Sequence, residues 1–194
     1  MTHLPPVTKF LMIVCAAVFG LMTLLPIEFE SAFALWPMSS THFAGWQVLT
    51  YAFLHADLMH LAFNLMGLWM FGSELERLWG KQRYIHFIIA SILAAAVVQM
   101  VWSQLTQNSA PTVGISGALF GLLLGYGMLF PNRIIVPLIP PIPMKAKYFV
   151  AIYGGIELFF GFSGSSGIAH FAHLGGMLGG FLMIRYWRGQ FPFK

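Results

Sequence analysis

Long apolar runs constrain this chain more than any other feature of its sequence. Several reach the roughly 20 residues that a helix needs to cross the hydrocarbon core of a bilayer. Because 58% of the residues are hydrophobic and only 8% are charged, polar side chains are too few to cover the surface of a soluble domain. The sequence therefore predicts an all-α, polytopic membrane helix bundle that forms one domain over residues 1–194.

Polar, glycine and proline breaks divide the apolar runs into six expected transmembrane helices. These spans cover residues 9–27, 53–73, 84–105, 114–130, 147–163 and 168–187. The first connection, 28–52, is rich in tryptophan and phenylalanine, so we expect it to rest in the interfacial layer. The connection 131–147 is rich in proline, which favours a stiff, extended segment.

The lysines and arginines all fall on one side of this arrangement. One precedes the first expected span, three follow the second, three follow the fourth and three end the chain. By the positive-inside rule both termini are cytoplasmic, and the connections after the first, third and fifth spans face outward. The same segregation accounts for the net charge of +4, so we expect the lipid bilayer as surroundings and no nucleic acid as partner.

Polar side chains inside the second expected span are candidates for function, because burying them in a membrane has a cost. His60 and Asn64 are four residues apart, which places them on one helix face. The pair can hold two helices together or act on a ligand, and the spacing alone favours neither. Asp57 lies near the helix start, where a carboxylate accepts backbone N–H groups, so we expect it to be a helix cap.

Ser116 opens the fourth expected span between Gly114 and Gly117. Serine is common in membrane helices, where it often only joins helices. Glycines beside it, however, let another backbone approach and leave N–H groups accessible, as a nucleophile with an oxyanion pocket requires. The segment is not the G-x-S-x-G elbow of soluble hydrolases, because Ala118 stands at its last position.

The sixth expected span carries His170 and His173 just before Gly176. A second glycine follows Gly176 after four residues, a spacing that permits tight helix contact. A histidine one turn before Gly176 is then held against a neighbouring helix. Because the second, fourth and sixth spans all enter from the outer side, Ser116, His60 and His173 are expected at one depth.

At these residues the sequence resembles the rhomboid family of intramembrane serine proteases. The resemblance covers residues 55–180 and rests on several motifs in a fixed order. They are H-x-x-x-N at His60 and Asn64, Phe71-Gly72…Glu74-x-Glu76…Gly80, G-x-S-G-x-x-F-G around Ser116, and A-H-x-x-H-x-G-G at 169–176.

The resemblance implies a six-helix bundle that cleaves transmembrane protein substrates in a bacterial cytoplasmic membrane, without a metal or other cofactor. Ser116 is then the nucleophile and His173 its general base, while His60 and Asn64 stabilise the oxyanion. Gly114 and His170 are implied to support the site. One departure lies in the first connection, where many members carry Trp-Arg and this chain carries Trp46-Gln47; it concerns the anchoring of that loop.

The physical chemistry of the side chains agrees with these roles. A serine hydroxyl is a weak nucleophile at neutral pH, and a histidine can accept and return its proton. No acidic residue is expected as a third member, since Glu157 lies near the middle of the fifth span and is interpreted as a hydrogen-bond partner in the bundle. We therefore expect a Ser–His dyad. Phe120, one turn after Ser116, is expected to stack on His173 and orient it.

Other interpretations of the sequence remain open. A rhomboid-like protein without activity would bind membrane proteins, although this chain keeps both Ser116 and His173. A metalloprotein would use the histidines near the outer face (His55, His60, His170, His173), but H-E-x-x-H is absent. A transporter would need more buried charge than the sequence offers. The glycine- and serine-rich connection 161–167 is either a mobile lid or a plain linker, and the sequence leaves oligomeric state open.

Overall fold

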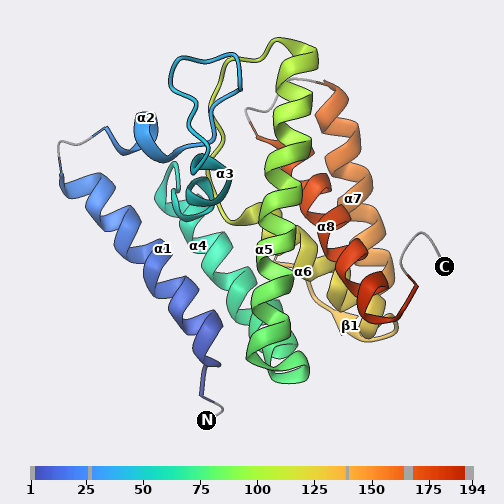
Figure 1. The fold of residues 1–194 in the computed structure, drawn as a ribbon. Coiled ribbons are helices and arrows are strands. Elements are labelled where there is room, and N and C mark those ends of the chain that lie inside the picture. Colours follow the sequence, from blue (N-terminus) through green and yellow to red (C-terminus); the bar gives the residue numbers. More distant parts are fainter. Residues whose placement is uncertain (1–2, 26–27, 139, 164–167, 191–194) are drawn as a thin grey trace.

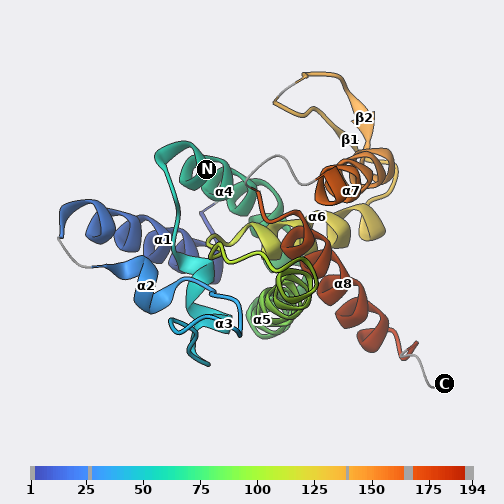
Figure 2. The same ribbon diagram turned by 90° about the horizontal axis from the view of Figure 1, so that it is seen from above.

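A computed structural model describes residues 3–25, 28–138, 140–163 and 168–190. The fold is mostly helical, as the apolar runs predicted (Figure 1). Its longer helices are α1 (Pro6–Leu24), α4 (Leu58–Gly67), α5 (Ser73–Thr106), α6 (Ser116–Leu129), α7 (Ala146–Ser163) and α8 (His170–Trp187). Seen from above, α1 and the first connection lie on one side of α4 to α6, and α7 and α8 lie on the other (Figure 2).

Short elements fill the connections. The first connection contains α2 (Phe29–Phe33), α3 (Gln47–Thr50) and a 3-10 turn (Tyr51–Phe53). The proline-rich connection joins two antiparallel strands, β1 (Ile134–Ile135) and β2 (Met144–Lys145). Its expected extended character is therefore present as a short ribbon between α6 and α7.

The expected break between the second and third spans is present. The spans 53–73 and 84–105 left a connection over 74–83, and the helical stretch Leu58–Thr106 is kinked at Gly80, inside that connection. Its φ of 76° lies in the left-handed region that glycine adopts without strain. A π-helical turn (Leu68–Gly72) connects α4 to α5, and the helix continues through the polar residues before Gly80 because they are good helix formers.

Apolar length does not distinguish every helix of the bundle. Among the described helices, Pro6–Leu24 and Leu58–Thr106 are long and apolar enough to cross a membrane, and Ser116–Leu129 is a shorter apolar helix. The other expected spans correspond closely to α7 and α8.

Helix α8 packs most extensively on α5 and α6, and glycines make this packing possible. A Cβ atom at Gly176 would overlap the backbone of Gly117 on α6. One turn later, a Cβ at Gly180 would lie 3.1 Å from the Cα of Gly121. The close contact that the glycine spacing predicted is confirmed, and it brings the starts of α6 and α8 together.

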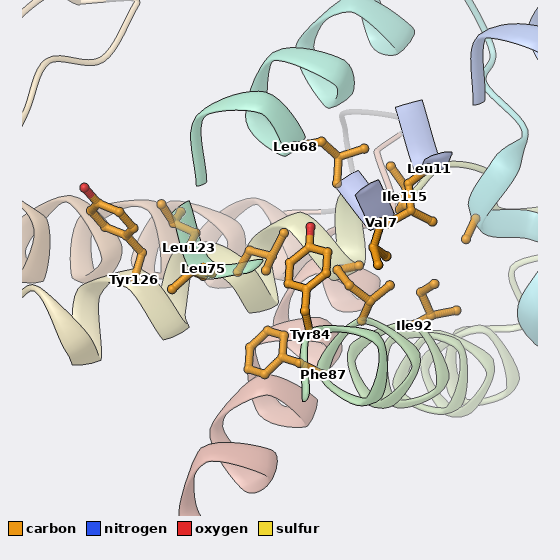
Figure 3. Close-up of a cluster of buried hydrophobic side chains, with 14 of the residues drawn as sticks. Val7, Leu11, Leu68, Leu75, Tyr84, Phe87, Ile92, Ile115, Leu123 and Tyr126 are labelled. Atoms are coloured by element: carbon orange, nitrogen blue, oxygen red, sulfur yellow. The ribbon is translucent and has the colours of Figure 1, made fainter. Parts of the chain in front are cut away.

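A buried apolar cluster joins α1, the π-helical turn, α5 and α6 (Figure 3). Leu68, Tyr84 and Phe87 within it are fully buried. Beside it, the buried carboxylate of Glu76 accepts hydrogen bonds from the backbone N of Val7 (2.9 Å) and Thr8 (2.7 Å). These N–H groups have no partner inside α1, so Glu76 caps that helix from another part of the chain.

Basic side chains after α4 and after α6 lie at the end of the bundle where α1 begins. Arg77 donates to the carbonyl of His3 (3.1 Å), and Arg133 forms an ion pair with Glu74 at the start of α5. In Figure 1 the last turn of α8 is at the same end. Arg77 and Arg133, which were expected on one side of the membrane, therefore share one end of the fold.

Gln47 anchors the first connection. Its side chain is fully buried; Nε2 donates to the carbonyl of His42 (2.8 Å), and Oε1 accepts from the backbone N of Trp36 (3.3 Å). The neutral amide thus supplies both a donor and an acceptor to the loop. Although Gln47 stands where an arginine was expected, it still anchors the loop.

Candidate active site

Ser116 is the first residue of α6, and the turn before it fixes its direction. Gly114 has a φ of 112°, and its N–H donates to the carbonyl of Tyr51 at 2.9 Å. A Cβ at Gly114 would lie 2.7 Å from His60 Nε2, so only glycine fits this position without displacing the histidine ring. The supporting role expected for Gly114 thus has a steric basis in this structure.

His173 lies in the first turn of α8 and faces Ser116. Its Nε2 is 2.8 Å from Ser116 Oγ, a hydrogen-bond distance between a hydroxyl and an imidazole nitrogen. Its ring stacks on that of Phe120, with centroids 4.3 Å apart and planes 8° from parallel. The stacking expected from the position of Phe120 one turn after Ser116 is observed.

His60 and Asn64 approach the same place from α4. Asp57 caps this helix, as predicted, by accepting from the backbone N of His60 at 2.8 Å. The position of His60 Nε2 beside Gly114 puts its ring next to the turn that carries Ser116. Asn64 is buried, and its Nδ2 has no hydrogen-bond partner among the described residues.

An unpaired buried amide donor is costly in a folded protein, and such groups are uncommon. The donor is useful where a negative oxygen appears only during a reaction. The structure thus places an unused donor on the helix face that also carries His60.

Glu157 corrects the expectation that no carboxylate is near the histidine. Its Oε2 lies 2.8 Å from Nδ1 of His173 and 2.5 Å from Nδ1 of His170. All three side chains are buried. Glu157 was expected near the middle of the fifth span, but α7 ends beside the start of α8, so Glu157, six residues before Ser163, reaches the first turn of α8.

One signal in the sequence pointed to this contact. A single acidic residue inside an apolar helix is costly and requires a partner. His170 and His173 lie on the next helix, and they were available as that partner. Spacing along the chain could not show which of the other helices Glu157 faces.

The Glu157 carboxylate determines which nitrogen of His170 and of His173 carries the hydrogen. An ionised carboxylate only accepts hydrogen bonds, so the Nδ1 of both histidines must carry the hydrogen. In a neutral His173 the Nε2 is then without hydrogen and can accept from the Ser116 hydroxyl. The arrangement is the one in which a histidine serves as base to a serine.

The four histidines that a metal site would use (His55, His60, His170, His173) do not gather into one cluster. Of the described residues, Glu157, His170 and His173 come together, with their ligand atoms within 4.8 Å of one another. His55 instead packs its ring on His60, with centroids 5.1 Å apart. The 2.5 and 2.8 Å separations between Glu157 and the histidines match hydrogen bonds, whereas ligand atoms around a tetrahedral zinc are about 3.3 Å apart.

Together the fold and the site define a class: a helical membrane protein in which a serine meets a histidine between the first turns of two packed helices. Comparison with known proteins gives the family. The sequence model of the Rhomboid domain matches residues 42–189. The chain belongs to the rhomboid family, whose members are multi-pass membrane proteins.

Curated relatives carry the names of rhomboid proteases. The chain is 30% identical over 187 residues to the Rhomboid protease GlpG of Yersinia pestis (strain Pestoides F), covering 94% of this chain and 62% of that protein. It is 34% identical over 138 residues to the Rhomboid protease GluP of Bacillus subtilis (strain 168), covering 70% of this chain and 25% of that protein. The chain thus spans 62% of the length of the GlpG relative and a quarter of the GluP relative.

Proposed function

We propose that this chain is an intramembrane serine endopeptidase that hydrolyses peptide bonds in or near the transmembrane segments of other membrane proteins. The observation that carries the proposal is the 2.8 Å separation between Ser116 Oγ and His173 Nε2. Membership of a family whose relatives are named proteases supports it.

Ser116 and His173 carry the two steps of the proposed reaction. Ser116 Oγ attacks the substrate carbonyl carbon while His173 takes the hydroxyl proton, and the carbonyl oxygen becomes an oxyanion. His173 then gives that proton to the leaving amine as the peptide C–N bond breaks. A water repeats the sequence on the ester of Ser116, which releases the carboxyl product and restores the serine.

His60, Asn64 and the backbone N–H of Ser116 are the proposed oxyanion donors. Ser116 is the first residue of α6, and the first N–H groups of a helix have no partner within it. In soluble serine proteases the loss of one such donor costs roughly 3 kcal/mol of transition-state stabilisation. The unpaired Nδ2 of Asn64 fits this role, since it loses no existing hydrogen bond when the oxyanion forms.

The proposed arrangement in the membrane has six spans, with both termini in the cytoplasm of a bacterial cell. The proposed spans are α1, α4 with the π-helical turn that follows it, α5, α6, α7 and α8. Because Ser116 and His173 lie in the first turns of α6 and α8, away from the end that carries the basic side chains, the site faces the outer half of the bilayer.

Fluorophosphonate labelling in detergent tests the nucleophile, combined with cleavage of a reporter membrane protein. Wild-type protein should label and cleave, while Ser116→Ala should do neither and His173→Ala should lose cleavage. Ser73→Ala is the matched control, because Ser73 is also a buried serine and lies at the start of α5, near the end with the basic side chains. Turnover by folded Ser116→Ala, or an unlabelled and inactive wild type, would contradict the proposal.

A further inference from the structure

We infer that Glu157 is a positioning residue that completes a Ser116–His173–Glu157 relay, so that the site has three members and not two. The inference rests on the proposed function. It assigns to a side chain of α7 the task of holding the base that serves the serine of α6.

Each nitrogen of the His173 ring makes one hydrogen bond. Nε2 meets Ser116 Oγ at 2.8 Å, and Nδ1 meets Glu157 Oε2 at 2.8 Å. Both contacts require the same tautomer of the neutral imidazole: Nδ1 carries the hydrogen that Glu157 accepts, and Nε2 is left free to accept from the serine hydroxyl. Glu157 therefore selects the form of His173 that can accept the serine proton.

Stacking on Phe120 cannot do this alone. The near-parallel rings fix the plane of the imidazole, but a stacked ring has the same contact when it turns over and exchanges its nitrogens and carbons. A carboxylate beside Nδ1 removes that ambiguity, because only the correct orientation presents an N–H to it. Phe120 and Glu157 thus restrict different rotations of the same side chain.

His170 holds Glu157 in place. Its Nδ1 lies 2.5 Å from the same Oε2, so two imidazole N–H groups converge on one oxygen. A buried carboxylate without such donors would be strongly disfavoured. The His170 ring is itself stacked with Phe160 of α7, with centroids 5.9 Å apart. The contact therefore joins α7 to the first turn of α8 at two histidines.

The relay affects the reaction when His173 becomes positively charged. After it takes the serine proton, the imidazolium faces the Glu157 carboxylate across one hydrogen bond, and this charged pair exists only during the reaction. Substrate binding does not use Glu157. Its loss should therefore lower kcat and leave KM nearly unchanged.

Steady-state cleavage of a reporter membrane protein by purified variants tests the inference. Glu157→Gln keeps the shape of the side chain but removes its charge and adds an N–H donor that opposes Nδ1. In a soluble serine protease the corresponding exchange of the triad aspartate for asparagine costs about 10⁴-fold in kcat; here, because Phe120 still holds the ring plane, we expect a loss of about 10³-fold. Glu157→Asp keeps a carboxylate on a shorter side chain, so its kcat should be at least about tenfold higher than that of Glu157→Gln.

The matched control is Glu76→Gln, which neutralises another buried carboxylate of the bundle. Glu76 caps α1, and its hydrogen-bond partners among the described residues, Val7 and Thr8, lie outside the site. It should lower the thermal transition of the protein and leave kcat within about threefold of wild type at temperatures where the protein is folded. If Glu157→Gln does not fold, His170→Phe provides the second variant; it removes one donor to Oε2 and should lower kcat about tenfold with KM unchanged.

Specific results would overturn the inference. A folded Glu157→Gln with kcat within about threefold of wild type, or a loss that appears only in KM, contradicts a positioning role. Metal dependence would also contradict it. If EDTA abolishes wild-type activity and zinc restores it only in protein that carries Glu157, then Glu157 is a metal ligand. Ser116→Ala separates the two proposals: turnover by that variant defeats the proposed function, whereas its inactivity beside an active Glu157→Gln defeats only the relay.

Discussion

Replacing Asn64 by leucine separates the activity of this site from its stability. Asn64 is 3% exposed, and its Nδ2 has no partner among the described residues. A buried polar group left unpaired costs about 1–3 kcal/mol of folding free energy. Leucine has nearly the same size without the donor, so Asn64→Leu should keep the free energy of unfolding or raise it by about 1 kcal/mol.

The same substitution should damage catalysis. If Nδ2 donates to the oxyanion, its loss removes roughly 3 kcal/mol from the transition state, which corresponds to about 10²-fold in kcat. KM should hardly change, because the donor acts on a charge that the bound substrate does not yet carry. The expected result is thus a protein as stable as the wild type, or more so, with far lower turnover.

Two measurements on the same preparation decide the outcome. Thermal unfolding in detergent gives the stability, and initial rates of reporter cleavage give kcat and KM. Ser73→Ala is the control, because Ser73 Oγ is also buried without a partner among the described residues but lies outside the site. Unchanged kcat in Asn64→Leu would refute the oxyanion role, and a marked loss of stability would show that Asn64 joins the helices instead.

Further outcomes follow from the packing, the stacking and the charge distribution. Phe120→Leu removes the ring that faces His173 at 4.3 Å and should lower kcat about tenfold without preventing labelling of the serine, as measured by labelling rate against cleavage rate. Gly176→Ala places a methyl group into the backbone of α6 and should destabilise the protein by about 3 kcal/mol or more in thermal unfolding, whereas alanine at the exposed Gly155 of α7 gives no such clash. Reporter fusions should place Lys145 in the cytoplasm and Ser109 outside; the reverse would overturn the proposed orientation.

Local patterns in the sequence determined the class of protein and most of the helices. Apolar runs of membrane length and the one-sided distribution of lysine and arginine need no knowledge of packing. Spacing within one helix placed His60 and Asn64 on a common face, and a glycine repeat on α8 predicted its close contact with α6. The expected lid, 161–167, includes residues 164–167, which lie outside the described residues.

Contacts between helices were decided only by the tertiary structure. The partner of Glu157 depends on how far α7 is shifted along α8 and how each helix is rotated, and no pattern within either helix fixes these two quantities. Gln47 likewise joins backbone groups up to 16 residues away, which its own sequence neighbours do not indicate. The sequence therefore determined which residues can take part in the chemistry, while packing decided that a carboxylate stands behind the histidine.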